Sequence, residues 1–505
     1  MHVKRMLLVT AVVAGLLQTA EAKVELATPF KDKMVLQRRM EVPVWGRADA
    51  GEKVKVAFAG ATRETTAGAD GRWMVRLPKM EACSEGRALT VNDQTVNDVL
   101  VGEVWFCAGQ SNTELPLVAG APMAYNPHFT DREGKMTAQL THETKVRFAY
   151  CSDYRWAVTP KERYEGEFKE WKEFIPENLG TGHSFSAMGV YFALQLHNTL
   201  DIPVGIVGTY WGGTNIDAWT PRSGYENMPA LKATADFKVV PETEWKPEMA
   251  KGVISGPFQQ PTVLWNEMVA PWTPFAARGL IWYQGCNNAA EGALYCDKMH
   301  ALYNGWAKEF GNPGFRLYFV QLAPWVQSWW DIELAQEKFA DEEPNAGMVV
   351  TPDVGNNADI HPNEKGTVGR RLAALALKRD YGFEKIVADY PRVVSAKALG
   401  REVVVKCSNV NRWELYNADW GCQVGFELKA PDGTWHRAYL LNCNNGARGG
   451  NPWYTRGEVE GRDLHVVSDE VDEPAGIRYL FQSPWTSFLY SCDSGLPLAA
   501  FIREW

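Results

Sequence analysis

The sequence predicts an α/β protein whose central parallel sheet carries helices on both faces and is flanked by two β-rich regions. From about residue 98 to residue 390, short apolar runs alternate with longer helical patterns, as in chains that build parallel sheets. Before and after this span, short strand-like segments are separated by clusters of turn residues. With 505 residues, the chain is too long for a single core. We therefore expect several domains.

The chain divides into four predicted parts. They are a signal peptide (1–22), an N-terminal β-sandwich (23–97), an α/β domain (98–390) and a C-terminal β domain (391–505). Lys4 and Arg5 precede an apolar segment that is too short to span a membrane, and small residues around Ala22 offer a cleavage site. These features predict an exported protein, periplasmic or extracellular, with no membrane anchor.

Charge and cysteine content narrow the range of partners. The net charge of −9 comes without a basic stripe, which argues against nucleic acid and anionic membranes as partners. The nine cysteines show no spacing typical of a metal cluster, and Cys422 and Cys443 are candidates for a disulfide across a hairpin. Oligomeric state stays open.

The two flanking regions show alternating strand patterns. The N-terminal strands are expected at 41–46, 53–58 and 72–77, the last after a hairpin signal at Asp70-Gly71. The C-terminal strands are expected at 402–406, 424–428 and 464–467, with a second hairpin signal at Asp432-Gly433. The tail at 495–501 is expected to pack back on the α/β domain.

The central region supplies the elements of the parallel sheet. Strands are expected at 99–107, 204–210, 279–283, 315–322 and 347–351, and helices at 185–200, 294–310 and 369–377. Ser184 or Ser186 would cap the first helix. Residues 120–180 are irregular and rich in aromatic side chains, which predicts loops over a site.

Polar clusters follow these strands. Ser111 comes just after Gly109 at the end of the first strand, and glycines or amides follow the second and third strands at 211–215 and 284–288. An Asp-His pair lies just past the last strand at 359–361. Ligand sites of open α/β sheets form outside the carboxyl ends of the strands. We therefore expect these clusters to converge.

The residue types in these clusters fit serine acyl transfer. A serine hydroxyl is a weak nucleophile and needs an imidazole base, for which His361 is the candidate for Ser111. A carboxylate must then orient the imidazole. Asp359 lies two residues away, so both side chains point the same way in an extended segment, and Asp353 is the alternative.

The tetrahedral intermediate also needs donors for its oxyanion. Each such donor contributes about 3–4 kcal/mol to transition-state stabilisation. The candidates are the N–H groups of Ser111 and Gly213 and a side-chain amide from Asn288 or Gln284.

Four motifs resemble those of the sialate O-acetylesterases, a family within the SGNH-hydrolase superfamily. They are Gly109-Gln-Ser-Asn112, Trp211-Gly-Gly-Thr214, Trp282-Tyr-Gln-Gly285 and Asp359-Ile-His-Pro362. Flanking segments at 34–37, 42–46, 98–102 and 495–497 also resemble this family, so the resemblance covers nearly the whole mature chain.

The resemblance implies a flavodoxin-like three-layer α/β/α domain and an exported carbohydrate esterase that forms an acyl-serine intermediate on O-acetylated sugars. No metal or organic cofactor is implied. By motif position, Ser111 would be the nucleophile, His361 the base and Asp359 its partner. Neighbouring motif residues are candidates for substrate binding: Gln110, Asn112, Trp211, Asn215 and Cys286.

Two departures from the family pattern bear on function. Thr113 stands where the family typically has Met, and Gly285-Cys-Asn-Asn288 replaces the usual Gly-Glu-Ser-Asn. Cys286 does not supply a carboxylate, which bears on the oxyanion assignment and on substrate preference. The departure and the 21 tryptophans leave a catalytically impaired, glycan-binding homologue as one alternative. An acetylxylan-type esterase is another, whereas no peptide-binding or lipid-lid signal supports a peptidase or lipase.

Overall fold

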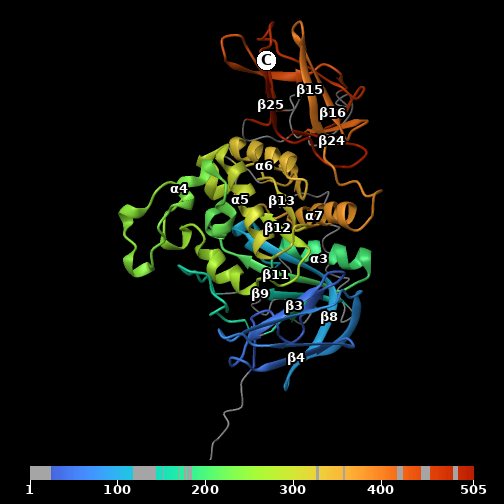
Figure 1. Ribbon diagram of the computed structural model, residues 1–505. Coiled ribbons are helices and arrows are strands. Elements are labelled where there is room, and N and C mark those ends of the chain that lie inside the picture. Colours follow the sequence, from blue (N-terminus) through green and yellow to red (C-terminus); the bar gives the residue numbers. More distant parts are fainter. Residues whose placement is uncertain are drawn as a thin grey trace, which may run out of the picture.

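The computed structural model describes eleven parts of the chain. They are residues 24–117, 144–151, 153–168, 170–175, 178, 185–325, 329–355, 359–417, 425–444, 455–481 and 487–505. The predicted signal peptide, Cys422 and much of the 120–180 stretch lie outside these residues. Within them, no helix has the length and apolar character needed to cross a bilayer. Figure 1 shows an α/β region between an N-terminal and a C-terminal β region.

The N-terminal region contains two groups of strands. One sheet holds β1 (Glu25–Leu26), β3 (Val42–Arg47) and β6 (Arg72–Leu77), and the other group holds β2 (Val35–Gln37), β4 (Lys53–Phe58), β5 (Ala61–Thr66), β7 (Cys83–Val91) and β8 (Gln94–Gly109). The turn predicted at Asp70-Gly71 forms, with Gly71 at a φ of +76°. The hairpin prediction is wrong, because β5 pairs with β4 whereas β6 pairs with β3.

Strand β8 links the N-terminal region to the α/β region. Its first residues pair with β7, and its later residues pair with the central strands β11 and β12. From residue 99 to residue 109 every side chain is buried, which explains the continuous apolar run in the sequence. The predicted domain limit between residues 97 and 98 falls inside this strand. One continuous hydrophobic core serves both regions.

The central sheet is parallel over six strands. Their order is β9 (Val146–Tyr150), β11 (Val204–Tyr210), β8, β12 (Gly279–Tyr283), β13 (Arg316–Val320) and β14 (Ala346–Val349), and β10 (Lys172–Glu173) pairs antiparallel with β9. Without β9, the order is the 2-1-3-4-5 of flavodoxin-like sheets. Strands β9 and β10 correct the sequence prediction, which treated this stretch as loops.

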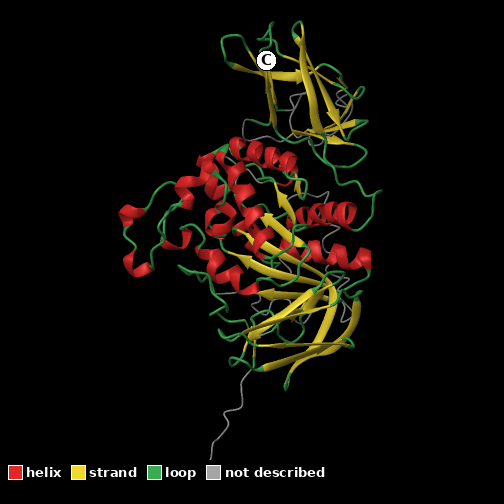
Figure 2. Cartoon of the chain, in the orientation of Figure 1, coloured by secondary structure: helices red, strands yellow, loops and turns green. Residues whose placement is uncertain are grey.

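Two pairs of helices cover the sheet (Figures 1 and 2). Helix α3 (Ala187–Leu200) packs against α7 (Lys365–Asp380), and α5 (Leu294–Glu309) packs against α6 (Trp330–Glu342). In β8, Trp105 contacts Phe192 of α3, whereas its neighbour Phe106 contacts Trp306 of α5. Successive strand residues point to opposite faces, so α3 and α5 lie on opposite sides of the sheet. Ser186, one of the two serines predicted to cap this helix, is the N-cap of α3. Its side chain accepts a hydrogen bond from Gly189 N–H.

Short helical turns connect these elements. They are α1 (Ser111–Glu114), α4 (Lys232–Ala235), η2 (Asp217–Trp219), η3 (Arg222–Tyr225), η4 (Pro229–Leu231), η5 (Glu242–Glu244), η6 (Pro247–Met249), η7 (Pro257–Gln259), η8 (Trp265–Val269), η9 (Ala270–Trp272), η10 (Cys286–Glu291) and η11 (Pro352–Val354). Three of them, α1, η2 and η10, belong to the loops that follow β8, β11 and β12.

The C-terminal region has a core of its own. One sheet has the order β15 (Arg392–Leu399), β16 (Glu402–Ser408), β22 (Leu464–Val467), β19 (Trp435–Leu440), β18 (Phe426–Lys429), β23 (Gly476–Tyr479), β25 (Phe501–Glu504); the other has β20 (Cys443–Asn444), β21 (Thr455–Val459), β17 (Trp413–Asn417), β24 (Ser487–Ser491). The hairpin predicted at Asp432-Gly433 is confirmed by the β18–β19 pairing. Leu496 of the tail packs against the core of the α/β region, as expected.

A buried ion-pair network fixes the loops after β11 and β12. Lys298 of α5 donates to Asp217 Oδ2 and to Glu291 Oε1, both at 2.6 Å. The side chains of Lys298 and Asp217 are each 3% exposed. Glu291 also accepts from Asn288 Nδ2 at 2.7 Å. One cation therefore holds a residue of η2 and a residue of η10 together.

We expect Lys298→Met to lower the free energy of unfolding by about 3–5 kcal/mol, because removing one member of a buried pair leaves its partners desolvated without compensation. Urea unfolding measures this loss. Lys232→Met is the matched control, since Lys232 pairs with Asp236 while 75% exposed and should stay near the stability of the unmodified protein. Equal stability of the two variants would contradict a structural role for the Lys298 network.

Candidate active site

Ser111 lies where β8 ends and α1 begins. Gly109 forms the turn with a φ of +143°, and a Cβ at this position would lie 2.4 Å from Tyr283 O. Only glycine fits such a close approach without shifting β12. The turn places Ser111 at the first position of α1, where backbone N–H groups have no partner within the helix.

The imidazole of His361 contacts the hydroxyl of Ser111. His361 Nε2 lies 2.9 Å from Ser111 Oγ, although the two residues are 250 positions apart in the chain. This distance is within hydrogen-bonding range for a serine and its general base. The structure therefore brings together the pair that the sequence predicted.

Asp359 lies beside His361, as predicted. Its Oδ1 accepts the backbone N–H of His361 at 2.9 Å and lies 3.6 Å from the ring Nδ1. The longer distance is beyond a good hydrogen bond, but contacts between catalytic groups often tighten when substrate binds.

The alternative acid, Asp353, is occupied elsewhere. Its side chain is fully buried, and it accepts hydrogen bonds from Arg371 Nη1 at 2.8 Å and from Arg371 Nη2 at 2.6 Å. A bidentate pair of this kind fixes both carboxylate oxygens. Of the two predicted acids, the geometry brings Asp359 to the imidazole.

Asn112 joins the nucleophile turn to the segment that carries His361. Its Nδ2 donates to Ile360 O at 3.1 Å, and its Oδ1 accepts from Lys365 Nζ at 2.6 Å. Lys365 also donates to Pro362 O at 2.7 Å. Asn112 was predicted to bind substrate, and the structure uses its side chain to hold the two parts of the site together.

The Gly212-Gly213 turn lies against Ser111. A Cβ on Gly212 would be 3.4 Å from the Cβ of Ser111. Gly212 N–H donates to Glu114 Oε2 at 2.6 Å, whereas Gly213 is exposed with a φ of +71°. Burial raises the pKa of Glu114, and the hydrogen bond from Gly212 opposes this shift. Sequence reasoning did not single out Glu114, although it lies just one helical turn after Ser111.

The side-chain amides of Gln284 and Asn288 are both buried and engaged. Gln284 Nε2 donates to Thr214 O at 3.1 Å and to Asn288 Oδ1 at 2.7 Å. Asn288 Oδ1 also accepts from Ile216 N–H at 3.1 Å. The two bonds from Gln284 use both of its amide hydrogens. Asn288 Nδ2 in turn donates to Glu291. The two predicted oxyanion donors thus connect the loops after β11 and β12.

Gln110 and Asn215 also make internal contacts. Gln110 is buried, and its Oε1 accepts from Gly285 N–H at 3.2 Å. Asn215 is fully buried, donating to Gln259 O at 2.8 Å and to Val253 O at 3.2 Å. Both were predicted to bind substrate. In the structure, they brace the loops around Ser111.

Trp211 belongs to an aromatic stack beside the glycine turn. Its ring lies 4.8 Å from the ring of Phe258 and 5.0 Å from that of Tyr154, and both pairs are stacked. The hydroxyl of Tyr154 donates to Glu114. Because Tyr154 is 47% exposed, the stack presents an aromatic surface to solvent next to the site.

Cys286 follows the glycine after β12 and is a free thiol. Burial raises its pKa to about 12, so the thiol stays neutral over the physiological range. Its electrostatic partner is Lys365, which is 2% exposed and which sequence reasoning missed.

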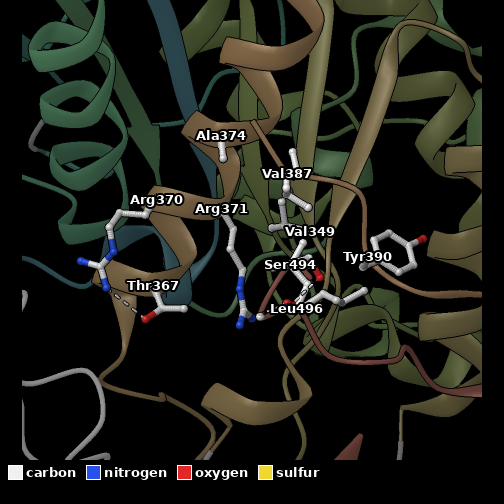
Figure 3. A pocket seen from close by; sticks show the side chains of 12 residues that line it. Val349, Thr367, Arg370, Arg371, Ala374, Val387, Tyr390, Ser494 and Leu496 are labelled. Carbon is white, nitrogen blue, oxygen red and sulfur yellow. Dashed lines mark hydrogen bonds between the residues drawn. The ribbon is translucent and has the colours of Figure 1, made fainter. Parts of the chain in front are cut away.

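A separate pocket lies between α7 and the C-terminal tail. Figure 3 shows Thr367, Arg370 and Arg371 on one side and Ser494 and Leu496 on the other. It measures about 300 Å³. None of Ser111, His361 and Asp359 lines it, so this pocket is distinct from the hydroxyl–imidazole contact.

One group of side chains among the described residues has the geometry for a metal ion. Ligand atoms of Cys296, His300 and Glu342 lie within 4.8 Å of one another. Lys338 Nζ donates to Glu342 Oε1 at 2.5 Å and contacts Cys296 Sγ at 3.7 Å, so an ammonium already neutralises this group. These residues belong to α5 and α6 rather than to the loops around Ser111.

The chain is similar to known carbohydrate esterases. A family model described as "Carbohydrate esterase, sialic acid-specific acetylesterase" matches residues 243–378. The sialate O-acetylesterase of Rattus norvegicus is 28% identical over 456 residues, covering 78% of this chain and 80% of the relative. The chain is thus similar to sialate O-acetylesterases over 72–78% of its length. It is therefore an ester hydrolase.

Two further relatives extend the comparison. The human sialate O-acetylesterase is 28% identical over 412 residues, covering 72% of each chain. The crystal structure of a carbohydrate acetylesterase from Xanthomonas citri is 28% identical and superposes with a TM-score of 0.76. That comparison covers 95% of this chain and all of the other. The likeness to this esterase therefore spans the flanking β regions as well as the α/β region.

We expect Asp359→Asn and Asp353→Asn to affect different properties of the esterase. Asp359→Asn should lower kcat at least about tenfold with little change in stability, because Asp359 contacts the base and is half exposed. Asp353→Asn should mainly destabilise the fold, by about 3–5 kcal/mol, because Arg371 loses its buried carboxylate. Hydrolysis of an aryl acetate and urea unfolding separate the two effects. The reverse result would make Asp353 the orienting acid.

Proposed function

We propose that this protein is an exported carbohydrate esterase that removes O-acetyl groups from sugars through an acyl-serine intermediate. The observation that carries the proposal is the 2.9 Å contact between Ser111 Oγ and His361 Nε2 at the carboxyl ends of the central strands. The similarity to sialate O-acetylesterases supports the choice of an acetyl ester as substrate. The signal-like segment at 1–22 supports export.

In the proposed reaction, Ser111 Oγ attacks the acetyl carbonyl while His361 Nε2 takes the hydroxyl proton. The tetrahedral intermediate collapses as the imidazolium returns this proton to the departing sugar oxygen. Water then attacks the acetyl-serine with the same base, which releases acetate and restores Ser111. Asp359 stabilises the charge that forms on His361.

The backbone N–H groups of Ser111 and Gly213 are the proposed oxyanion donors. Ser111 N–H lies at the unpaired start of α1, and the exposed Gly213 lies on the turn that contacts Ser111. Glu114 supports this arrangement because it binds Gly212 N–H and thereby fixes the turn. Gln284 and Asn288 bind the residues that follow this turn. Gln284 donates to Thr214 O, and Asn288 accepts from Ile216 N–H.

The proposed substrates are O-acetylated sugars, with acetylated sialic acids and acetylated plant polysaccharides as the two candidates. The names of the relatives favour sialic acids. The aromatic stack of Tyr154, Trp211 and Phe258 is suited to the apolar face of a sugar ring, with Tyr154 as its exposed member.

A catalytically impaired glycan-binding protein is the second candidate, and Cys286 is the observation that favours it. The half-buried neutral thiol of Cys286 stands where the third motif of the family has a glutamate. Binding alone does not activate a hydroxyl, so a fluorophosphonate that labels the native protein but not Ser111→Ala rejects this candidate.

We expect Ser111→Ala to lose acetate release by about a thousandfold or more, because the nucleophile is removed while the fold is kept. The measurement is acetate release from acetylated glycans and from a small aryl acetate. Ser223→Ala is the control, because this serine bonds to Glu309 outside the site and its loss should leave the rate unchanged. Equal rates for native protein and Ser111→Ala would refute the serine mechanism.

Substrate choice is tested by comparing 9-O-acetylated sialic acid with acetylated xylan at equal acetyl concentration. We expect the higher kcat/KM on the sialic acid, in line with the relatives. A higher kcat/KM on xylan would instead assign the esterase to plant polysaccharides.

A further inference from the structure

Lys365 is a buried cation four residues after His361. It lies in the first turn of α7, and it is 2% exposed. Its Nζ donates to Asn112 Oδ1 at 2.6 Å and to Pro362 O at 2.7 Å. Both acceptors are neutral oxygens. Fully buried lysines are usually paired with a carboxylate, yet no ion pair joins Lys365 to one within the described parts of the chain.

The groups that face Lys365 do not supply a close negative charge. Cys286 approaches from η10, and the ring centroid of Tyr283 in β12 lies 5.4 Å from Nζ. Asp359 and His361 belong to the segment before α7, and Asp359 is half exposed and bonded to the backbone of His361. Burial lowers the pKa of Lys365 to about 7, and the influence of Cys286 and Asp359 only partly opposes this shift.

The two hydrogen bonds of Lys365 join the turn that carries Ser111 to the segment that carries His361. Asn112 follows Ser111 directly, and Pro362 follows His361 directly. A bond to each therefore sets the distance between the nucleophile turn and the segment of the base. Misplacing reacting groups by about 1 Å costs on the order of a hundredfold in rate, so this distance matters for the reaction.

We propose that Lys365 is a positioning residue whose charged amine holds Asn112 and Pro362, and thereby Ser111 and His361, at a fixed distance. The neutral thiol of Cys286 leaves this cation without a counter-ion. The proposal rests on the proposed function, because it concerns the alignment of Ser111 with His361. Hydrogen bonds from a charged donor are stronger than those from a neutral amine. Loss of the proton from Lys365 therefore loosens the link, and kcat falls on the alkaline side.

The first experiment compares Lys365→Met with the native enzyme. Methionine keeps the volume and removes the donors, so kcat should fall about tenfold to a hundredfold while KM stays within about twofold. The urea midpoint should be unchanged or higher, because the variant no longer buries an unpaired charge. Lys385→Met, at an exposed lysine beyond α7, is the control and should match the native enzyme.

The second experiment compares Cys286→Glu with Cys286→Ser over a range of pH. The glutamate supplies the missing counter-ion and should raise the pKa of Lys365, so the alkaline limb of kcat should move up by at least about one pH unit. The serine adds no charge and should leave the limb where it is in the native enzyme. A shift in Cys286→Glu alone supports the proposal.

Three results overturn it: full kcat in Lys365→Met, a parallel loss of kcat and stability in that variant, or a common alkaline limb for Cys286→Glu and Cys286→Ser. If Cys286→Glu does not fold, Lys365→Met decides alone. Full activity of Lys365→Met beside an inactive Ser111→Ala removes this inference and leaves the proposed function intact. Full activity of Ser111→Ala removes the proposed function itself.

Discussion

The register of three strands at Gly109 is the constraint on which the site depends. Gly109 pairs with Tyr210 of β11 on one side and with Tyr283 of β12 on the other. The three strands therefore end at one level, and the loops that follow them start side by side. A side chain at Gly109 would collide with Tyr283 O, so glycine permits the turn that presents Ser111 between its neighbours.

The loops beside Ser111 keep their shape because their polar groups are satisfied internally. Gln284 and Asn288 join the two loops, Glu291 accepts from Asn288, and Lys298 connects Glu291 to Asp217. Each of these groups would be costly to bury alone. The network explains why the side-chain amides of Gln284 and Asn288, which looked like open donors in the sequence, are committed to structure.

The sequence predicts those strands and helices whose formation depends on the local pattern of apolar and polar residues. Strands β11 and β12 are found at the predicted residues, because strands buried on both faces read as continuous apolar runs. Strand β9 was missed because the buried Arg147 breaks its apolar pattern, and that arginine is satisfied by Asp98 and by backbone carbonyls. Helix α6 was missed, although Ile332, Ala335 and Phe339 follow helical spacing.

Within the candidate site, the grouping of Ser111, His361 and Asp359 could be predicted because serine acyl transfer, the proposed reaction, requires these residue types. Glu114 and Lys365 could not, since an isolated Glu or Lys in a sequence is most often an exposed surface residue. Their roles depend on contacts with Gly212, 98 residues away, and with Asn112, 253 residues away. The Asp70-Gly71 hairpin failed for the same reason. The turn is local, but the partners of its strands are not.

Glu114 and Lys365 are two ionisable groups that contact the surroundings of Ser111, Glu114 through Gly212 and Lys365 through Asn112. The Glu114 carboxylate accepts hydrogen bonds from Gly212 N–H and from the Tyr154 hydroxyl, and both stabilise its negative charge. Burial raises the pKa of Glu114, so this carboxylate takes up a proton more readily than an exposed one. Burial has the opposite effect on Lys365, whose pKa it lowers. Both groups are thus held closer to neutrality than they would be in water, and each acts through the backbone or amide that it holds.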